Sequence, residues 1–246
     1  MKAMGFMVSN TQKLVQQQYA ISGEEYDAIR LKDPRGALLS AFDVELVHQL
    51  ARTISRDAKV LEAGAGTGRF TIPMIRSGFR VTATDINESL LATLRERLVS
   101  EGLADACVVQ DESIFELSFP DESFDFAYSI HVIPRFLCLE DQEKALIELA
   151  RVLKPGGRLL FNFWNRSSLL GAMTKKYAAR AAEMDRAIQK AQMKVIDRRG
   201  KWLLSRGVLR KLPLAGGRAL ALCEKPLSRF LPRRAWDVFT LAEKQR

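Results

Sequence analysis

Cysteine and histidine are scarce in this chain of 246 residues. It has three cysteines, Cys107, Cys138 and Cys223, and only two histidines. No two cysteines form a C-x-x-C pair, so the spacing that holds zinc is missing and we expect no bound metal. Few, widely spaced cysteines fit a reducing cytoplasm, which is the expected location, with each thiol acting as a small hydrophobic group.

Long hydrophobic runs are also missing. No stretch of 18 apolar residues is found, so we expect no membrane-spanning helix. The first ten residues, MKAMGFMVSN, lack the apolar run of a signal peptide. Repeats and flexible linkers are absent as well, while 47% of the residues are hydrophobic. This length and composition fit one large α/β domain or two small ones with a substantial core, and we predict a single domain, 1–246.

Charge is distributed unevenly along the sequence. Residues 1–165 hold 18 Lys and Arg against 23 Asp and Glu, whereas residues 166–246 hold 20 against 6, a net charge of +14. The acidic and basic parts are therefore expected to have different roles.

Apolar runs alternate with helical patterns through the middle of the chain. Strands separated by helices at this spacing predict parallel β-α-β units with right-handed crossovers. The expected strands are 59–62, 79–84, 106–109, 124–130 and 158–164, and the expected helices are 68–77, 87–101 and 140–152.

Different patterns flank this alternation. Before it, amphipathic helices are expected at 11–30 and 36–55. After it, an apolar stripe from Leu169 to Val195 predicts one long helix, followed by a short helix at 205–212. Two final strands are then expected, and their short connection favours an antiparallel pair; they are placed at 218–223 and 238–242.

A glycine-rich turn follows the first strand, in V60-L-E-A-G-A-G-T-G-R-F70. Glycine permits a tight turn and lets a ligand approach the backbone without a β-carbon in the way. The N–H groups of the helix that follows favour negative ligand groups. The spacing is G-x-G-x-G, and Arg69 stands where a dinucleotide-binding turn would have Gly or Ala. Asp85 ends the next strand, where its carboxylate can accept both hydroxyls of a ribose.

At these residues the chain resembles the class I S-adenosylmethionine-dependent methyltransferases, especially those acting on small molecules. The resemblance extends through V108-V-Q-D-E-S113, F119-P-D-E-S-F-D-F-A-Y-S-I-H131 and L153-K-P-G-G-R-L-L160. It implies an α/β, Rossmann-like sheet of seven strands in the order 3-2-1-4-5-7-6. Strand 7 would be antiparallel, with helices on both faces.

The resemblance also implies a binding role for individual residues. Asp85 would bind the ribose of S-adenosylmethionine, Ile86 would pack on the adenine, and Asp111 would accept from the adenine amino group. Ser129 would offer its carbonyl to the methionine amino group, and Tyr26 would close over that end. The methionine half would lie along Glu62, Gly64, Ala65 and Gly66, and backbone contacts near the adenine would come from Glu112 and Ser113.

Methyl transfer requires little acid–base chemistry, because the donor carbon is already activated. The protein mainly holds the acceptor in line with the breaking bond, and a weak oxygen or carbon nucleophile also needs a base. His131, just past the fourth strand, is the candidate base; a packing or hydrogen-bonding role is the alternative. No Asn/Asp-Pro-Pro-Tyr motif follows that strand, which argues against most adenine- and glutamine-methylating enzymes.

Three functions are compatible with these features. The leading one is methyl transfer to a small or lipid-like acceptor, with S-adenosylhomocysteine as product. The second is RNA methylation that uses the basic C-terminal third. The third is a methyltransferase-like scaffold without activity. Aromatic residues among the basic ones also suggest a peripheral position at an anionic membrane surface. The expected division is a helical cap at 1–40, a cofactor-binding core at 41–165, a helical cap over the acceptor at 166–212, and the last two strands at 213–246.

Overall fold

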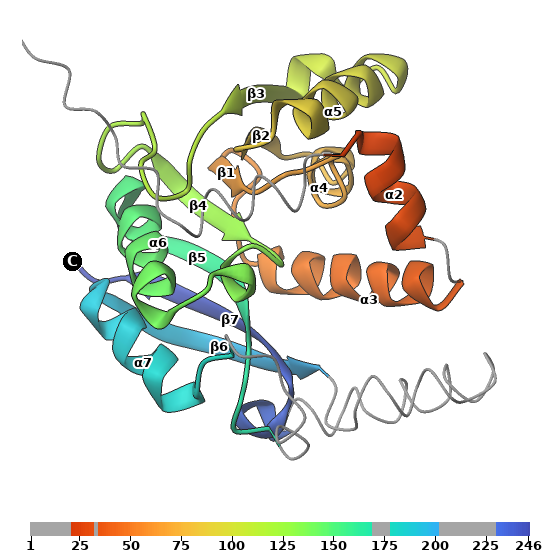
Figure 1. The fold of residues 1–246 in the computed structure, drawn as a ribbon. Helices are drawn as coiled ribbons and strands as arrows, with labels where there is room; N and C mark the ends of the chain where they lie inside the picture. The colour runs from red at the N-terminus through yellow and green to blue at the C-terminus, as the bar shows by residue number, and fades with distance from the viewer. Residues whose placement is uncertain (1–20, 32–33, 169–177, 202–229) are drawn as a thin grey trace, which may run out of the picture.

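A seven-stranded sheet forms the centre of the molecule in the computed structural model, which describes residues 21–31, 34–168, 178–201 and 230–246 (Figure 1). The strand order is β3-β2-β1-β4-β5-β7-β6, as expected. The strands are β1 (Lys59–Ala63), β2 (Arg80–Asp85), β3 (Cys107–Asp111), β4 (Phe124–Ser129), β5 (Leu153–Trp164), β6 (Met193–Lys201) and β7 (Asp237–Lys244).

The direction of the strands divides the sheet into two parts. β1 pairs in parallel with β2 and β4, and the parallel pairing continues to β3 on one side and β5 on the other. β7 runs antiparallel to both β5 and β6, which confirms the expected reversed strand. The five parallel strands therefore end at one edge of the sheet, where ligands of open α/β folds bind.

Helices cover both faces of the sheet because alternate strand residues point to opposite sides. Val60 and Phe126 pack in a core with residues of α3 (Pro34–Ala51), α4 (Thr71–Arg76) and α5 (Glu88–Ser100). Their neighbours Leu61 and Ala127 pack in a second core with α6 (Leu139–Val152) and α7 (Ala181–Lys190). Figure 1 shows α6 and α7 on the side of the sheet opposite α3.

The sequence-based assignment after Asn165 was wrong in one part. The long helix expected over 168–195 ends at Lys190 in α7, and the next segment is strand β6. Gln192 adopts φ 55°, and its N–H donates to the carbonyl of Gln189 at 2.9 Å, as in a helix C-terminal cap. Glutamine here gave no sequence signal for a stop. The sixth strand is therefore Met193–Lys201, whereas the segments 11–20, 205–212 and 218–223 lie outside the described residues.

Within the described ranges, none of the helices combines the length and the apolar character needed to cross a lipid bilayer.

Candidate cofactor and acceptor site

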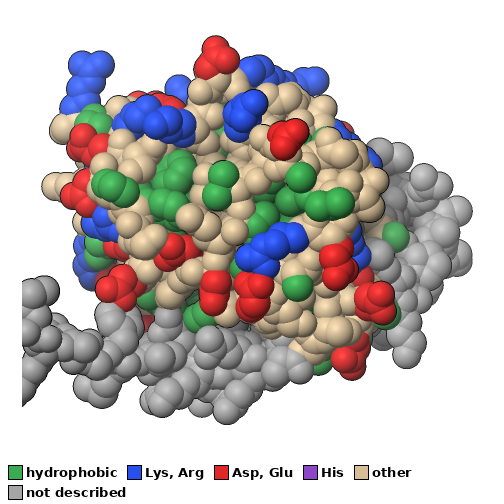
Figure 2. All heavy atoms as spheres, turned by 90° about the horizontal axis from the view of Figure 1, so that it is seen from above, with side chains coloured by type: hydrophobic (Ala, Val, Ile, Leu, Met, Phe, Trp, Pro, Cys, Tyr) green, Lys and Arg blue, Asp and Glu red, His purple; other side chains and the backbone are tan. Residues whose placement is uncertain are grey.

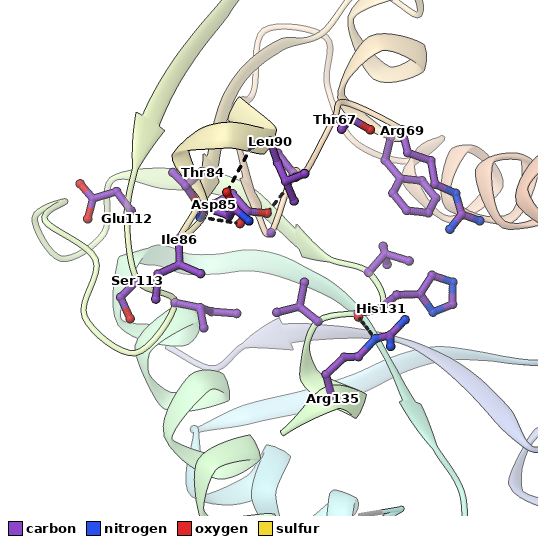
Figure 3. Close-up of a pocket in the computed structure, with 18 of the residues that line it drawn as sticks. Thr67, Arg69, Thr84, Asp85, Ile86, Leu90, Glu112, Ser113, His131 and Arg135 are labelled. Carbon is purple, nitrogen blue, oxygen red and sulfur yellow. Dashed lines mark hydrogen bonds between the residues drawn. The ribbon is translucent and has the colours of Figure 1, made fainter. Parts of the chain in front are cut away.

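A pocket opens at the carboxyl ends of β1, β2 and β4 (Figure 3). The glycine turn after β1, the loop after β2 and the loop after β4 form its walls, and Tyr26 of α2 (Gly23–Leu31) also lines it. Eight of the predicted cofactor-binding residues and the predicted base line this pocket: Tyr26, Gly64, Ala65, Gly66, Asp85, Ile86, Glu112, Ser113 and His131.

The glycine turn is built from residues with left-handed backbone conformations. Gly64 has φ 89° and Gly66 has φ 54°. The N–H groups of Gly64 and Ala65 both donate to the carbonyl of Thr84, at 2.7 and 2.8 Å, which ties the turn to the end of β2. A Cβ on Gly64 would lie 2.1 Å from a Val132 methyl, so only glycine fits between the turn and the loop after β4.

Asp85 is held in place by backbone N–H groups. Its carboxylate accepts from Gly66 N–H at 2.8 Å and from Asn87 N–H at 3.0 Å. Burial raises the pKa of Asp85 despite these hydrogen bonds. Asn87, as expected, is the N-cap of α5 and accepts from Ser89 and Leu90. Asp85 is therefore free of a capping role and lines the pocket.

The loop after β3 forms the opposite wall at this end. Ile86, Glu112 and Ser113 line the pocket, and the N–H of Glu112 donates to the carbonyl of Asp85 at 3.1 Å. Asp111 pairs with Asp85 in the sheet register, but its side chain is exposed and does not line the pocket. The structure thus places Asp111 next to Asp85 in the sheet but outside the cavity wall, and its adenine contact stays a prediction.

Glu62 and Ser129 lie directly behind the pocket lining. Both are buried, and neither lines the cavity. The Glu62 carboxylate accepts from Thr71 Oγ1 at 2.5 Å and from the Tyr128 hydroxyl at 2.8 Å. The Ser129 hydroxyl donates to the carbonyl of Ala63 at 2.8 Å and joins the ends of β4 and β1. In this structure both side chains support the turn.

Helix α2 is tied to the glycine turn by a partly buried ion pair. Asp27 accepts from Thr67 Oγ1 at 3.0 Å and from Arg97 at 2.5 Å, and Arg97 also donates to the carbonyl of Thr67. This tie brings the neighbouring Tyr26 to the pocket. The N-terminal segment therefore contributes an aromatic side chain to the pocket wall, and closure of Tyr26 over the methionine end stays a prediction.

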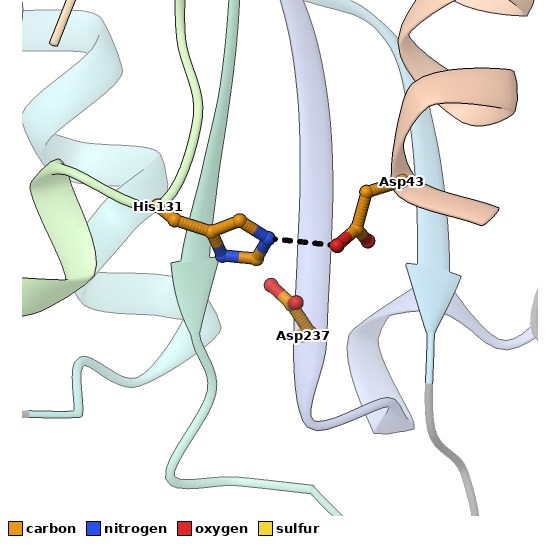
Figure 4. A group of neighbouring side chains, drawn as sticks. All are labelled: Asp43, His131 and Asp237. Atoms are coloured by element: carbon orange, nitrogen blue, oxygen red, sulfur yellow. Dashed lines mark hydrogen bonds and ion pairs between the residues drawn. The ribbon is translucent and has the colours of Figure 1, made fainter. Parts of the chain in front are cut away.

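Several residues around His131 were missed from the sequence. Its ring contacts a buried cluster of polar and charged side chains that comes from α3, β5, β6 and β7 and from the glycine turn (Figure 4). We call this set the His131 network; its other members are Asp43, Arg69, Asn162, Lys201 and Asp237.

One sequence signal could have found part of this network. Asp43 lies four residues before Val47 and seven before Leu50, on the same helical face, and all three are buried. A carboxylate on the buried face of a helix requires a partner of opposite charge.

Comparisons with known proteins agree on the type of fold and domain. Residues 61–161 match the protein family described as "Methyltransferase domain". A ubiquinone/menaquinone biosynthesis C-methyltransferase UbiE from Brucella anthropi is 40% identical over 106 residues, which are 41% of this chain and 38% of that protein. The UbiE protein of Pectobacterium carotovorum is 37% identical over 110 residues, 44% of this chain and 43% of that protein. The match thus spans well under half the length of these relatives.

Solved structures match a larger part of the chain. Magnesium protoporphyrin IX methyltransferase from Synechocystis, with bound S-adenosylmethionine, aligns with a TM-score of 0.68 over 98% of this chain and 100% of that one, at 14% identity. The CcbJ methyltransferase of Streptomyces caelestis aligns with a TM-score of 0.64 over 83% and 90%, at 14% identity.

The sheet order, the glycine turn and Asp85 define a Rossmann-like methyltransferase fold. Together with the match of residues 61–161 to a methyltransferase domain, they make the chain similar to the class I S-adenosylmethionine-dependent methyltransferases. The same fold also occurs in the [4+2]-cyclase SpnF, which aligns with a TM-score of 0.61 over 82% of this chain and 81% of that one, at 18% identity. The fold alone therefore does not determine the reaction, which depends on the residues of the site.

Proposed function

We propose that this protein transfers a methyl group from S-adenosylmethionine to a small, lipid-like acceptor. The observation that carries the proposal is the pocket in which the glycine turn, Asp85 and the loop after β3 meet His131. One end of this pocket offers the glycine backbone and a carboxylate, and the other offers apolar side chains and a histidine.

Open space beside the glycine backbone and an accepting carboxylate support S-adenosylmethionine as the ligand of the cofactor end. A Cβ built on Gly66 would meet only one atom, Leu90 Cδ1 at 4.0 Å, so the backbone at Gly66 borders open space. A ligand can approach there without displacing a side chain. Carboxylate oxygens carry more lone pairs than the backbone N–H groups around Asp85 use, which suits hydrogen bonds from ribose hydroxyls. When bound, the cofactor would supply a sulfonium-activated methyl group.

The acceptor end is largely apolar. Phe70, Val132 and Phe136 line it, together with Phe115 from the loop after β3. This wall fits an acceptor with a flat ring or an alkyl chain. The relatives named for ubiquinone and menaquinone biosynthesis support a quinone-like ring as the first acceptor to test.

His131 is the proposed proton acceptor at this end. Its side chain is 23% exposed and lines the pocket beside Phe70. A hydroxyl-bearing acceptor would lose its proton there, whereas an amine would need no base.

RNA methylation receives less support from the described residues. Basic side chains of the C-terminal third form local ion pairs, since Asp185 pairs with both Arg198 and Arg233, and Asp197 pairs with Arg199. Figure 2 shows another face, seen from above Figure 1, on which Lys, Arg, Asp and Glu side chains surround a group of hydrophobic ones.

Calorimetry tests the cofactor part of the proposal. S-adenosylhomocysteine should bind and raise the melting temperature, because a hundredfold excess over its Kd stabilises the folded state by about 2.7 kcal/mol. NAD should neither bind nor stabilise the protein. No heat with either S-adenosylmethionine or S-adenosylhomocysteine would contradict it.

A transfer assay tests the acceptor part. The protein and methyl-labelled S-adenosylmethionine would be incubated with a short-chain hydroquinone, with a phospholipid extract and with total RNA. We expect label in the hydroquinone or lipid fraction. Label in RNA alone would favour the second function, and no transfer to any fraction despite cofactor binding would favour an inactive scaffold.

A further inference from the structure

The carboxylate of Asp43 determines the state of one ring nitrogen of His131. Asp43 is buried, which opposes ionisation, but the charges of Lys201 and Arg69 and the hydrogen bond from His131 hold its pKa well below the usual range. An ionised carboxylate can only accept hydrogen bonds. His131 Nε2 lies 3.0 Å from Asp43 Oδ2, so Nε2 must carry the proton.

Asn162 determines the state of the other ring nitrogen independently. The backbone N–H of His131 donates to Asn162 Oδ1 at 2.6 Å, which fixes the orientation of the amide. Asn162 Nδ2 then donates to Asp237 Oδ1 at 2.7 Å and lies 3.2 Å from His131 Nδ1. A proton on Nδ1 would place one donor against another, so Nδ1 must be unprotonated.

These two constraints agree. We infer that Asp43 and Asn162 are positioning residues that hold His131 as the neutral Nε2–H tautomer, so that Nδ1 takes the proton of the acceptor. This inference rests on the proposed methyl transfer to a hydroxyl-bearing acceptor. In the proton step, the acceptor O–H bond breaks and an N–H bond forms at Nδ1. The electron pair stays on the acceptor oxygen and makes it the nucleophile.

The contact between Asn162 Nδ2 and His131 Nδ1 is the one that opens in this step. At 3.2 Å it is the longest of the three hydrogen bonds of the Asn162 amide, and the His131 ring must turn away from Nδ2 in this step because a protonated Nδ1 would otherwise face a second donor. The imidazolium that forms lies between two carboxylates, Asp43 at one nitrogen and Asp237 nearby (Figure 4). Both stabilise its charge.

The backbone conformation of His131 supports a functional role for this residue. Its φ is 63°, a conformation that non-glycine residues rarely adopt. Strained residues of this kind concentrate at functional sites, and the 2.6 Å bond to Asn162 helps to hold this one.

The same three side chains could in principle bind a metal, since one ligand atom each of Asp43, His131 and Asp237 lies within 4.8 Å of the others. However, both oxygens of Asp43 already accept from cations, Oδ2 from Arg69 and Oδ1 from Lys201. Positive charge is thus present where a metal would supply it, which favours the proton-accepting role.

Histidine NMR tests the inference without cofactor or acceptor. The chain has two histidines, so ¹⁵N-histidine labelling gives two sets of ring signals, and His131→Gln assigns them. At a pH where the ring is neutral, His131 should show the Nε2–H tautomer alone. The Nδ1–H tautomer, or an equal mixture, would overturn the inference.

Variants then test the positioning role. In Asp43→Asn, an amide cannot accept from Arg69, Lys201 and His131 together, so a second His131 tautomer should appear. Asp125→Asn is the matched control, because it removes a carboxylate paired with Lys154 at the opposite end of the parallel strands. Unchanged His131 signals in Asp43→Asn would contradict the role.

Two further measurements separate the alternatives. Once an acceptor is identified, Asp43→Asn should lower kcat at least tenfold while leaving the Kd of S-adenosylhomocysteine within threefold. Addition of Mg²⁺ or Zn²⁺ should leave the His131 signals in place; a metal that shifts them and raises activity would replace the proton relay with a metal site. Failure of cofactor binding would reject the proposed function while leaving the tautomer result intact.

Discussion

Replacing Glu62 with glutamine should remove a pH dependence from the stability of this protein. Glu62 is 1% exposed, and its burial raises the pKa of the carboxyl from 4.5 to about 7, against the hydrogen bonds from Thr71 and Tyr128. The folded state therefore binds a proton more tightly than the unfolded chain. The associated stability is fully present below pH 4.5 and is lost as the pH rises through 7.

The size of the effect follows from the pKa shift. One unit corresponds to 1.36 kcal/mol, so Glu62 should cost the wild type about 3 kcal/mol of unfolding free energy between pH 4.5 and 8. Glutamine has nearly the same shape, and its carbonyl oxygen can accept both bonds that Glu62 Oε2 accepts. Glu62→Gln should therefore become more stable relative to the wild type as the pH rises.

Urea unfolding at intervals from pH 4.5 to 8, without cofactor, would measure this difference. Asp125→Asn is the control, because Lys154 and Lys59 hold the pKa of Asp125 below its usual value despite burial. That pairing stabilises the protein above about pH 3.8 and loses its effect only as the pH falls below, so its difference from the wild type should stay constant over the same range. A constant difference for Glu62→Gln as well would refute the reasoning.

Three other predictions follow from the site and the surface. Asp85→Asn should weaken S-adenosylhomocysteine binding by about 1–3 kcal/mol in calorimetry, because the ribose hydroxyls lose a charged acceptor. Binding by Asp85→Asn as tight as that of the wild type would exclude the ribose role. Asp111→Asn, which changes an exposed side chain, tests the predicted adenine contact of Asp111 in the same assay. The free energy of unfolding of Gly64→Ala should be about 1–3 kcal/mol lower than that of Gly102→Ala, since both glycines have positive φ but only at position 64 would the Cβ overlap a side chain. Equal losses of unfolding free energy in urea would contradict this. The protein should sediment with anionic vesicles better than with neutral ones, and salt should weaken this binding, because Phe230 is 80% exposed near Arg233 and Arg234. Phe230→Ser should reduce the binding. Equal sedimentation with both vesicle types would contradict the membrane hypothesis.

The parallel half of the sheet was predictable because local and long-range preferences agree there. β1 is apolar, buried on both faces and followed by a glycine turn and a helix, so Lys59–Ala63 could hardly be anything but a central strand. β6 lacks this agreement. It is an edge strand in which Lys194, Asp197 and Arg199 alternate with few apolar residues, and its first residues extend the apolar stripe of α7. Helical periodicity therefore continued in the sequence beyond the point where the helix ends.

The two ends of the candidate site differ in the same way. Most of the predicted cofactor side comes from contiguous motifs, so the glycine turn and Asp85 could be located by spacing, and the loop at Glu112 by the family resemblance. The His131 network joins residues that are distant in sequence, with 88 positions between Asp43 and His131 and 158 between Asp43 and Lys201. Only the folded sheet brings such residues together, and no local sequence pattern predicts that they meet.

The uneven charge of the sequence also has a partly internal explanation. The basic C-terminal part contacts the acidic part across the fold, since Lys201 pairs with Asp43 and Lys190 pairs with Glu143 on α6. Buried charge requires a partner of opposite sign, so the first of these pairs stabilises both the position of β6 and the ionised state of Asp43. Asp43 in turn fixes the tautomer of His131. A lysine that appeared in the sequence as one of many surface charges therefore sets, through Asp43, the chemistry available at the acceptor end of the pocket.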